Sequence, residues 1–353
     1  MSKKILVIKP DEIGDVILLI PFLKELRKQR SHHQIVLASN PKTHTLVGVF
    51  PWVDEVISYS RDFRSHTMWS KVRVSLSAVK FLLKHGCFFY DEVYLMRTIP
   101  FFPEKILTQL SFGKKRIGWL NGGWLGLYTH PLKFQSGYHE VSQLGCALPT
   151  STSELSNCHF PCGESKIRNA KRLFPATATR IVAIGANLTI DENRNWPIAS
   201  YAAFIQQLHE KDLQLHFVLL GGEGDVASNE KLIHLTGGYV QSIAGKCSLI
   251  ESYAALHYCS LFVGNDSGPM HLAAAAGLPV IEISGYPIGG DVSHANAPER
   301  FGPFGVPFRV CRPSEELVAW DKNQNESRIQ EVSVLNVLES YFDLCKEVGL
   351  FYG

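Results

Sequence analysis

A phosphate-binding turn is indicated by residues 265–268, which read Asn-Asp-Ser-Gly between the apolar run 261–264 and a small-residue segment. Free amides at a helix start, together with the helix dipole, form a site for a diphosphate. Gly268 would let a phosphate approach the backbone, Ser267 could donate a hydroxyl hydrogen bond, and His271 would lie one turn further on. The alternative is an ordinary capped helix in which His271 is a satisfied core residue.

A candidate general base follows the first apolar run. Residues 5–8 lead into a turn that holds Asp11, Glu12 and Asp15. The pattern is not GxGxxG, so a nicotinamide dinucleotide is not indicated. A carboxylate at the carboxyl end of a first strand is placed to remove a proton from a hydroxyl. Asp15 therefore either accepts a proton or only favours the positive end of a helix.

Two further polar segments follow apolar runs in the second half of the chain. Asn187 and Thr189 could bond phosphate, and Arg194 could neutralise one. In the sequence LLGGEGD, Glu223 could accept hydrogen bonds from ribose hydroxyls, as acidic residues in nucleotide folds do. The alternatives are a solvated loop and a helix start that carries a favourable acid.

The elements that must position these turns alternate along the chain, which predicts an α/β fold with parallel, doubly wound sheets. We expect strands at 5–8, 35–38, 55–59, 92–96, 115–120, 181–186, 215–220, 240–244, 261–264 and 280–284. Helices are expected at 15–30, 68–85, 164–173, 197–208 and 332–346. The apolar stripe of the helix at 68–85 consists of Val72, Leu76, Val79 and Leu83.

Length and composition indicate two domains. The chain has 353 residues, and domains typically hold about 150. The β-α alternation weakens between residues 150 and 179, so we predict one domain at 1–165 and a second at 166–331. Two doubly wound domains facing each other would form a deep cleft at the carboxyl ends of their strands.

Charge and cysteine content exclude several classes of protein. A net charge of +2 disfavours a general nucleic-acid binder. The eight cysteines are scattered, so no metal is expected, and free thiols suit a reducing compartment. No apolar run approaches 18 residues, and the first strand is too short for a signal peptide. We therefore expect a cytoplasmic protein.

Taken in order, these motifs resemble glycosyltransferase family 9, the ADP-heptose:lipopolysaccharide heptosyltransferases. The resemblance covers most of the chain. It runs from Ile-Gly-Asp-Val at 13–16 through Asn-Trp-Pro at 195–197 and the Gly-Gly-Glu turn to Asn-Asp-Ser-Gly-Pro-Met-His at 265–271. Arg194 stands nearest the position where the family often has Lys before Trp-Pro. The loop 286–304 also departs from the family pattern.

The resemblance implies a GT-B fold with two Rossmann-like domains and an interdomain cleft. The helix at 332–353 would pack back on the first domain. The enzyme would invert configuration without a metal or other cofactor. Its base would be Asp15, and its nucleotide-sugar donor, ADP-heptose, would bind the second domain. The donor residues implied or proposed are Asn187, Thr189, Arg194, Glu223, Asp266, Ser267, Gly268 and His271.

The resemblance further implies an anionic, lipid-linked saccharide acceptor of lipopolysaccharide biosynthesis. Candidate acceptor contacts are Lys9, Arg61, Arg64, Arg97 and Arg116. The aromatic segments 88–90 and 101–102 either belong to the core or touch the inner face of the cytoplasmic membrane. Two other functions stay open: a nucleotide-sugar epimerase on the same fold, and a nucleotide-sugar-binding protein without catalysis.

Overall fold

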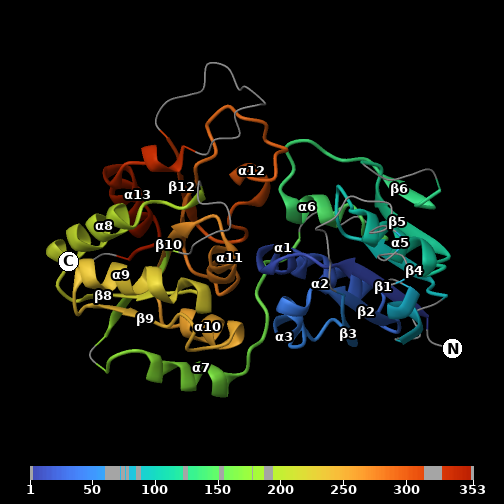
Figure 1. Cartoon of the computed structure of the whole chain (residues 1–353), viewed down its shortest axis with the longest axis horizontal. Coiled ribbons are helices and arrows are strands. Elements are labelled where there is room, and N and C mark those ends of the chain that lie inside the picture. The colour runs from blue at the N-terminus through green and yellow to red at the C-terminus, as the bar shows by residue number, and fades with distance from the viewer. Residues whose placement is uncertain are drawn as a thin grey trace. The chain divides into compact units, whose positions relative to one another are not determined.

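The computed structural model describes residues 3–59, 72, 76, 79–84, 89–121, 126–150, 155–176, 178–186, 194–313 and 328–350. These residues form two compact units, which divide at Ser156 and Asn157 (Figure 1). The division falls nine residues before the predicted boundary. Each unit contains one parallel six-stranded sheet, so two doubly wound halves are confirmed.

The first unit has strands β1 (Lys4–Lys9), β2 (Gln34–Ser39), β3 (Glu55–Ser58), β4 (Glu92–Leu95), β5 (Lys115–Trp119) and β6 (His130–Leu132). Its helices with described bounds are α1 (Ile13–Leu18), α2 (Ile20–Gln29), α3 (His44–Val47), α5 (Phe102–Leu110) and α6 (Glu140–Gly145), with a short 3-10 turn at Pro41–Thr43. Residues 72, 76 and 79–84, within the helix predicted at 68–85, are also helical. The strand order is β3-β2-β1-β4-β5-β6. The single helix predicted at 15–30 is divided into α1 and α2, because Pro21 lacks the N–H that would continue the hydrogen bonding of α1.

Both faces of the first sheet are buried, as a parallel sheet requires. In β1, Leu6 and Ile8 belong to one core, which also holds Leu82 and Leu107. On the alternate positions, Tyr94 of β4 meets Phe22 of α2, with ring centroids 5.4 Å apart. The continuous apolar run of β1 therefore follows from burial on two sides.

The second unit has strands β7 (Arg180–Gly185), β8 (Leu215–Leu219), β9 (Val240–Ser242), β10 (Leu261–Asn265), β11 (Val280–Ile283) and β12 (Phe308–Cys311). Its helices are α7 (Glu164–Ala170), α8 (Ile198–Lys211), α9 (Val226–Thr236), α10 (Leu249–Leu256), α11 (Gly268–Ala275), α12 (Pro298–Phe301) and α13 (Val334–Glu347). The 3-10 turns with described bounds are Lys171–Leu173, Glu223–Asp225 and Ile329–Glu331. The strand order is β12-β11-β10-β7-β8-β9.

The final helix corrects one prediction. We expected the segment 332–353 on the first domain, but α13 belongs to the second unit. Its apolar side, which includes Val337, Tyr341 and Leu344, is buried in the core that α8 and the second sheet share. The spacing of these residues made a helix predictable, but it could not show which sheet the helix would cover.

Candidate active site

Each sheet reverses its winding direction at one place, and the described site candidates other than Glu223 and Arg116 lie near these two places. In the first unit the reversal lies between β1 and β4, and in the second between β7 and β10. Loops that leave the carboxyl ends of such neighbouring strands diverge to opposite faces of the sheet, which opens a crevice where ligands bind. The turn after β1 carries Asp15, and the turn after β10 carries Ser267.

The first cluster surrounds Lys9, the last residue of β1. Its buried ammonium lies 3.2 Å from an oxygen of Asp11 and 3.2 Å from an oxygen of Asp15. Arg97, which follows β4, pairs with the other oxygen of Asp11. Asp15 is in the first turn of α1, and 34% of its side chain is exposed. One carboxylate is thus buried as an anchor, while the other reaches the surface.

Burial raises the pKa of the Asp15 carboxyl, and the nearby Asp11 charge adds to this effect, whereas the Lys9 ammonium opposes it. Burial disfavours the charged form of Lys9 as well. The carboxylates of Asp11, Asp15 and Glu140 outweigh that effect, so the pKa of Lys9 is raised and the group is an ammonium ion. Asp15 is therefore a basic carboxylate held in place by a fixed positive charge.

The second cluster joins the segments after β7 and β10. The Arg194 guanidinium pairs with the Asp266 carboxylate and donates to the Asp266 carbonyl oxygen at 3.2 Å. The neighbouring Asn265 side-chain oxygen accepts from the Tyr201 hydroxyl at 2.9 Å and from the Trp196 amide at 3.3 Å. These bonds tie the segment around Arg194 to the end of β10, so the cation has a fixed position.

Helix α11 begins with the predicted turn. Ser267 is its N-cap and Gly268 its first residue, and the Ser267 Oγ is shielded without a hydrogen-bond partner in the described residues. Pro269 has no N–H, so the amides available at this end are those of Ser267 and Gly268. His271 is buried, with its Nε2 4.0 Å from Asp266 Oδ1. The turn provides a hydroxyl and amides at a helix start.

Glu223 is also at the carboxyl edge of the second sheet, but it lies further from the reversal. It begins the 3-10 turn after β8, and its side chain is exposed. Gly221 has a φ of +154°, and a Cβ there would meet the Asp225 Cβ at 2.6 Å. The glycine is therefore required by the tight turn that presents Glu223.

Three predicted acceptor contacts are occupied within the first unit. Lys9 is buried against two carboxylates, as described above. Arg97 also donates to the Ile99 carbonyl at 3.0 Å and lies over the Phe101 ring. Arg116 uses its guanidinium for the carbonyls of Leu127, Gly113 and Gly126 at 2.8, 3.1 and 3.0 Å. Lys9 and Arg116 thus have structural roles. The candidates Arg61, Arg64, Asn187 and Thr189 lie outside the described residues.

Sequence reasoning missed three residues that shape these clusters. Asp11 forms ion pairs with Lys9 and Arg97; the sequence predicted the turn that contains Asp11 but not this role. Asn265 organises the Trp196 segment. Glu282 is buried within β11, and burial together with the Asp266 charge raises its pKa well above the ordinary value. A single glutamate inside the apolar run Val-Ile-Glu-Ile was a signal that could have identified it.

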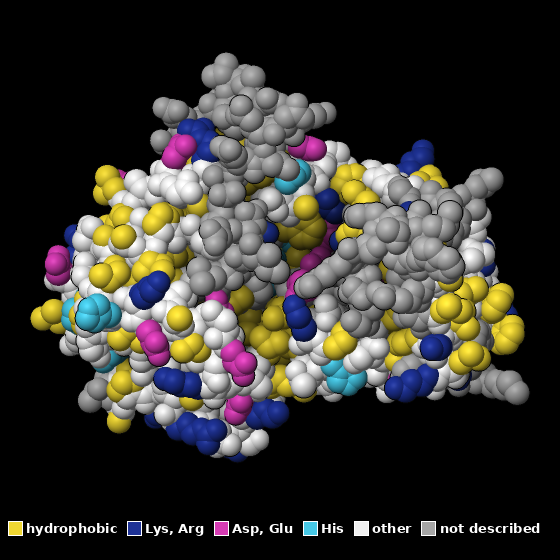
Figure 2. Space-filling model, in the orientation of Figure 1, with side chains coloured by type: hydrophobic (Ala, Val, Ile, Leu, Met, Phe, Trp, Pro, Cys, Tyr) yellow, Lys and Arg dark blue, Asp and Glu magenta, His cyan; other side chains and the backbone are white. Residues whose placement is uncertain are grey.

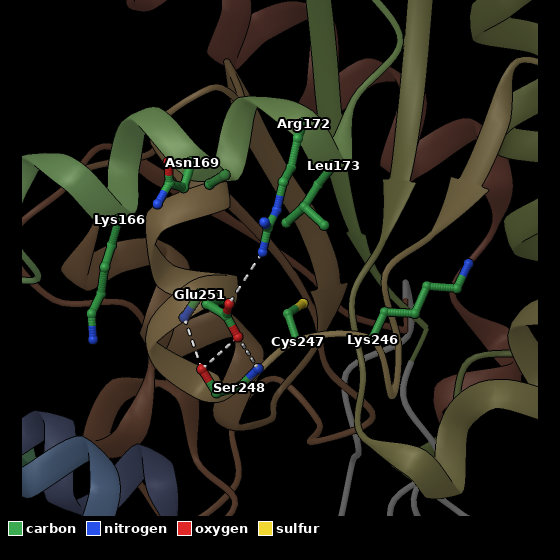
Figure 3. A pocket seen from close by; sticks show the side chains of 9 residues that line it. Lys166, Asn169, Arg172, Leu173, Lys246, Cys247, Ser248 and Glu251 are labelled. Atoms are coloured by element: carbon green, nitrogen blue, oxygen red, sulfur yellow. Dashed lines mark hydrogen bonds and ion pairs between the residues drawn. The ribbon is translucent and has the colours of Figure 1, made fainter.

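A separate hollow of about 130 Å³ lies between α7 and the segment that leads into α10 (Figure 3). Lys166, Arg172 and Lys246 contribute to its lining. Arg172 pairs with Glu251 at 3.8 Å, and Glu251 caps α10 through Ser248. Lys246 extends away from the other labelled side chains (Figure 3). This hollow contains none of the predicted site residues.

The described residues contain no cluster of metal-ligating side chains. Their seven cysteines are free thiols. Across the same parts of the chain, no helix is both long and apolar enough to cross a membrane.

Comparison with known proteins decides the family. The model of glycosyltransferase family 9 (heptosyltransferase) matches residues 107–289, which is more than half of the chain. This chain belongs to glycosyltransferase family 9. It is therefore a glycosyltransferase, and the family predicted from the sequence is confirmed.

Among curated proteins, the family 9 chain is similar to lipopolysaccharide heptosyltransferase 3 of Escherichia coli, with 26% identity over 46% of this chain and 48% of that protein. It is also similar to lipooligosaccharide heptosyltransferase 2 of Haemophilus ducreyi, with 22% identity over 78% of this chain and 81% of the relative. The first of these alignments spans about half of the length of the relative.

Solved structures establish the fold. A family 9 glycosyltransferase from Veillonella parvula has a TM-score of 0.76 at 20% identity, covering 98% of this chain and 97% of that one. E. coli ADP-heptose lipopolysaccharide heptosyltransferase II has a TM-score of 0.73 at 18% identity, with coverages of 98% and 99%. The GT-B fold, with two Rossmann-like domains, is thereby confirmed.

Proposed function

We propose that this glycosyltransferase transfers heptose from ADP-heptose to a lipopolysaccharide-core or related saccharide, with inversion and without a metal. The observation that carries the proposal is the Arg194–Asp266 pair beside the Ser267-Gly268 turn, at the reversal point of the second sheet. A guanidinium, a hydroxyl and helix-start amides in one place are suited to a diphosphate.

The similar proteins support this choice of donor. One solved structure, with a TM-score of 0.68, is E. coli heptosyltransferase WaaC with ADP-2-deoxy-2-fluoro heptose. The curated relatives act on lipopolysaccharide or lipooligosaccharide, as their names state. We carry this chemistry to the present chain as a proposal, with Glu223 assigned to the ribose. Asn187 and Thr189 remain proposed phosphate contacts.

The proposed reaction is a single displacement. A hydroxyl oxygen of the acceptor attacks the anomeric carbon while Asp15 accepts the hydroxyl proton. The bond from that carbon to the diphosphate oxygen breaks, and the diphosphate leaves with the electron pair. Attack from the face opposite the leaving group inverts the configuration.

Fixed positive groups would stabilise the departing diphosphate. Arg194 is held by Asp266, and the Ser267 hydroxyl and the Gly268 amide lie at the start of α11. Donors that are already oriented toward a developing charge require no rearrangement during the reaction. We assign Lys9 the positioning of Asp15, in place of the acceptor contact first expected, because its ammonium is buried between two carboxylates.

The acceptor is proposed to be an anionic, lipid-linked saccharide at the inner face of the cytoplasmic membrane. Arg97 retains partial exposure, with 25% of its side chain accessible, and is the described cation that we propose for acceptor binding. Arg61 and Arg64 remain proposed contacts. An enzyme that acts on such an acceptor would work in the cytoplasm, and this location is part of the proposal.

Asp15→Asn tests the assignment of the base. The amide cannot accept the proton, so turnover should fall about a hundredfold or more. Binding of ADP, measured by calorimetry, should change little, because the proposed donor residues are in the other unit. The matched control is Glu12→Gln, which removes an exposed carboxylate from the same turn. Near-normal turnover by Asp15→Asn would remove Asp15 from this role.

Two further assays test the class of reaction and the metal. An epimerase of similar fold has a TM-score of 0.50, and an epimerase would convert the donor without an acceptor. We expect no such conversion.

The similar E. coli glycosyltransferase TibC is an iron-containing dodecamer. Transfer by this chain should survive a chelator, and loss of activity that iron restores would contradict metal independence.

A further inference from the structure

The helical segment of the first unit that includes residues 79–84 turns its apolar stripe to solvent. Val72, Leu76, Val79 and Leu83 are 45%, 57%, 36% and 66% exposed. Their spacing places them on one face of a helix, and such a stripe normally faces the core. Large exposed apolar surfaces mark sites of interaction. This stripe therefore indicates a binding face.

The other side of the same helix anchors it to the sheet. Leu82 is fully buried in the core that contains Leu6 and Leu107. Phe81 packs against this core, and its ring centroid lies 5.0 Å from that of Tyr59. The exposure of the stripe is thus the result of a definite orientation, because the helix already buries a different apolar side.

Two aromatic rings of the same unit are exposed in an unfavourable backbone conformation. Phe89 is 76% exposed and Phe112 is 53% exposed, and the rings stack with centroids 5.8 Å apart. Their φ angles are +61° and +51°, which bulky residues rarely adopt. The Phe89 amide donates to the Ser111 carbonyl at 2.9 Å, which fixes this geometry. Strain that is maintained by the surroundings often marks a functional surface.

Both charged residues that the structure describes in this helical segment, Lys80 and Lys84, are basic. Residues 71–84 contain four basic residues and no acidic one. Lys80 and Lys84 are exposed, and the helical period places both on one flank of the stripe. Figure 2 shows hydrophobic side chains gathered at the right-hand end of the first unit, with Lys and Arg side chains beside them. An apolar face with a basic flank is typical of helices that lie in a membrane interface.

We propose that the lipid-insertion face, defined as Val72, Leu76, Val79 and Leu83, enters the interface of an anionic lipid bilayer, and that the exposed Phe89–Phe112 pair of the same unit enters it too. Lys80 and Lys84 would then lie among the lipid phosphates. The basic flank favours an anionic bilayer over a second copy, since a twofold contact brings the same surface, with its like charges, together. The inference deepens the proposed function by naming the surface that meets the membrane of a lipid-linked acceptor.

Vesicle binding by the full chain tests this face directly. Wild type should co-sediment with vesicles of phosphatidylglycerol and phosphatidylethanolamine, bind phosphatidylcholine vesicles more weakly, and dissociate as salt is raised. Leu76→Gln with Leu83→Gln should lower the partition coefficient about tenfold or more, since two leucines would leave the apolar phase. Lys80→Glu with Lys84→Glu should lower binding to anionic vesicles only.

The matched control is Leu335→Gln, a 63% exposed leucine at the start of α13 in the other unit, and it should bind vesicles like wild type. Equal vesicle binding by wild type and the double glutamine variant would overturn the proposal. A second outcome would also overturn it: analytical ultracentrifugation shows that the wild type is a dimer and the double glutamine variant a monomer, and the wild type binds no vesicles. Transfer to a delipidated acceptor should be unchanged in the variant. Absence of transfer in both proteins would instead count against the proposed function.

Discussion

At the scale of single residues, both units use the same device at the reversal point of their sheet. Arg97 and Asp11 pair between the segments after β4 and β1, and Arg194 and Asp266 pair between those after β7 and β10. Breaking a partly buried ion pair leaves one charge uncompensated, which is costly. Each pair therefore fixes two segments that are distant in sequence and holds a cation at the carboxyl edge of its sheet.

Lys9→Met tests the control of Asp15 by its neighbour. The Lys9 ammonium favours the charged carboxylate, so its removal should raise the pKa of Asp15 further. Proton acceptance requires the carboxylate form. The acidic limb of the pH profile of kcat/KM should therefore move to higher pH, with activity lost earlier as the pH falls.

The control for this experiment is Lys42→Met. Lys42 is exposed, and its Nζ lies 4.0 Å from Oε1 of Glu12, a residue of the turn after β1. Its profile should match that of wild type. If the acidic limb of the Lys9→Met profile stayed at the wild-type pH, the catalytic group that titrates there would not be an Asp15 carboxyl whose pKa Lys9 controls.

At the scale of elements, the close approach of β7 and β10 sets the geometry of the proposed donor site. A Cβ on Gly264 would meet the Gly185 carbonyl oxygen at 2.8 Å and its Cα at 2.9 Å. Both contacts are with backbone, which cannot rotate away. Gly264 is therefore required where β10 pairs with Gly185 of β7, and the Arg194 and Asp266 segments follow these strand ends.

The orientation of the helix at 79–84 gives a matched pair of stability predictions. Leu82 is fully buried and Leu83 is 66% exposed. Leu82→Ala should lower the free energy of unfolding by about 2–5 kcal/mol, because it removes core contacts and leaves a cavity. Leu83→Ala should change it by less than about 0.5 kcal/mol. Urea unfolding measures both, and the reverse order would mean that the stripe faces the core.

At the scale of the whole molecule, the two units divide the proposed chemistry. The proposed base, Asp15, is in Met1–Ser156, and the proposed donor residues are in Asn157–Gly353. A ligand that binds one folded unit should stabilise that unit first. Local opening, and therefore hydrogen exchange, reports such stabilisation segment by segment.

ADP binding followed by hydrogen exchange tests this division. Saturating ADP should slow exchange in residues 194–197, 221–226 and 266–271, which follow β7, β8 and β10. Residues 9–18, which hold Asp15, should change much less, because ADP lacks the acceptor. Protection confined to residues 9–18 would place the nucleotide in the first unit and contradict the assignment.

Local patterns made most of the fold and part of the site predictable. Strands buried on both faces appear as continuous apolar runs, so ten of the twelve strands found in the described residues were expected; the short β6 and β12 were missed. The turns that hold Asp15, Glu223 and Ser267 were recognised because turn residues follow apolar runs. The roles of Lys9 and Arg116 were not predictable, since burial against carboxylates or carbonyls leaves no mark in the sequence.

The sequence by itself determined the two doubly wound halves, the position of each polar turn and the family resemblance, because helical and strand periods and turn chemistry are local properties. Only the tertiary structure decided which charges pair, across 72 residues for Arg194 and Asp266 and 86 for Arg97 and Asp11. It also decided that α13 covers the second sheet and that the stripe at Val72 to Leu83 faces solvent. These outcomes depend on strand order and on competition between apolar faces for one core, which no local pattern encodes.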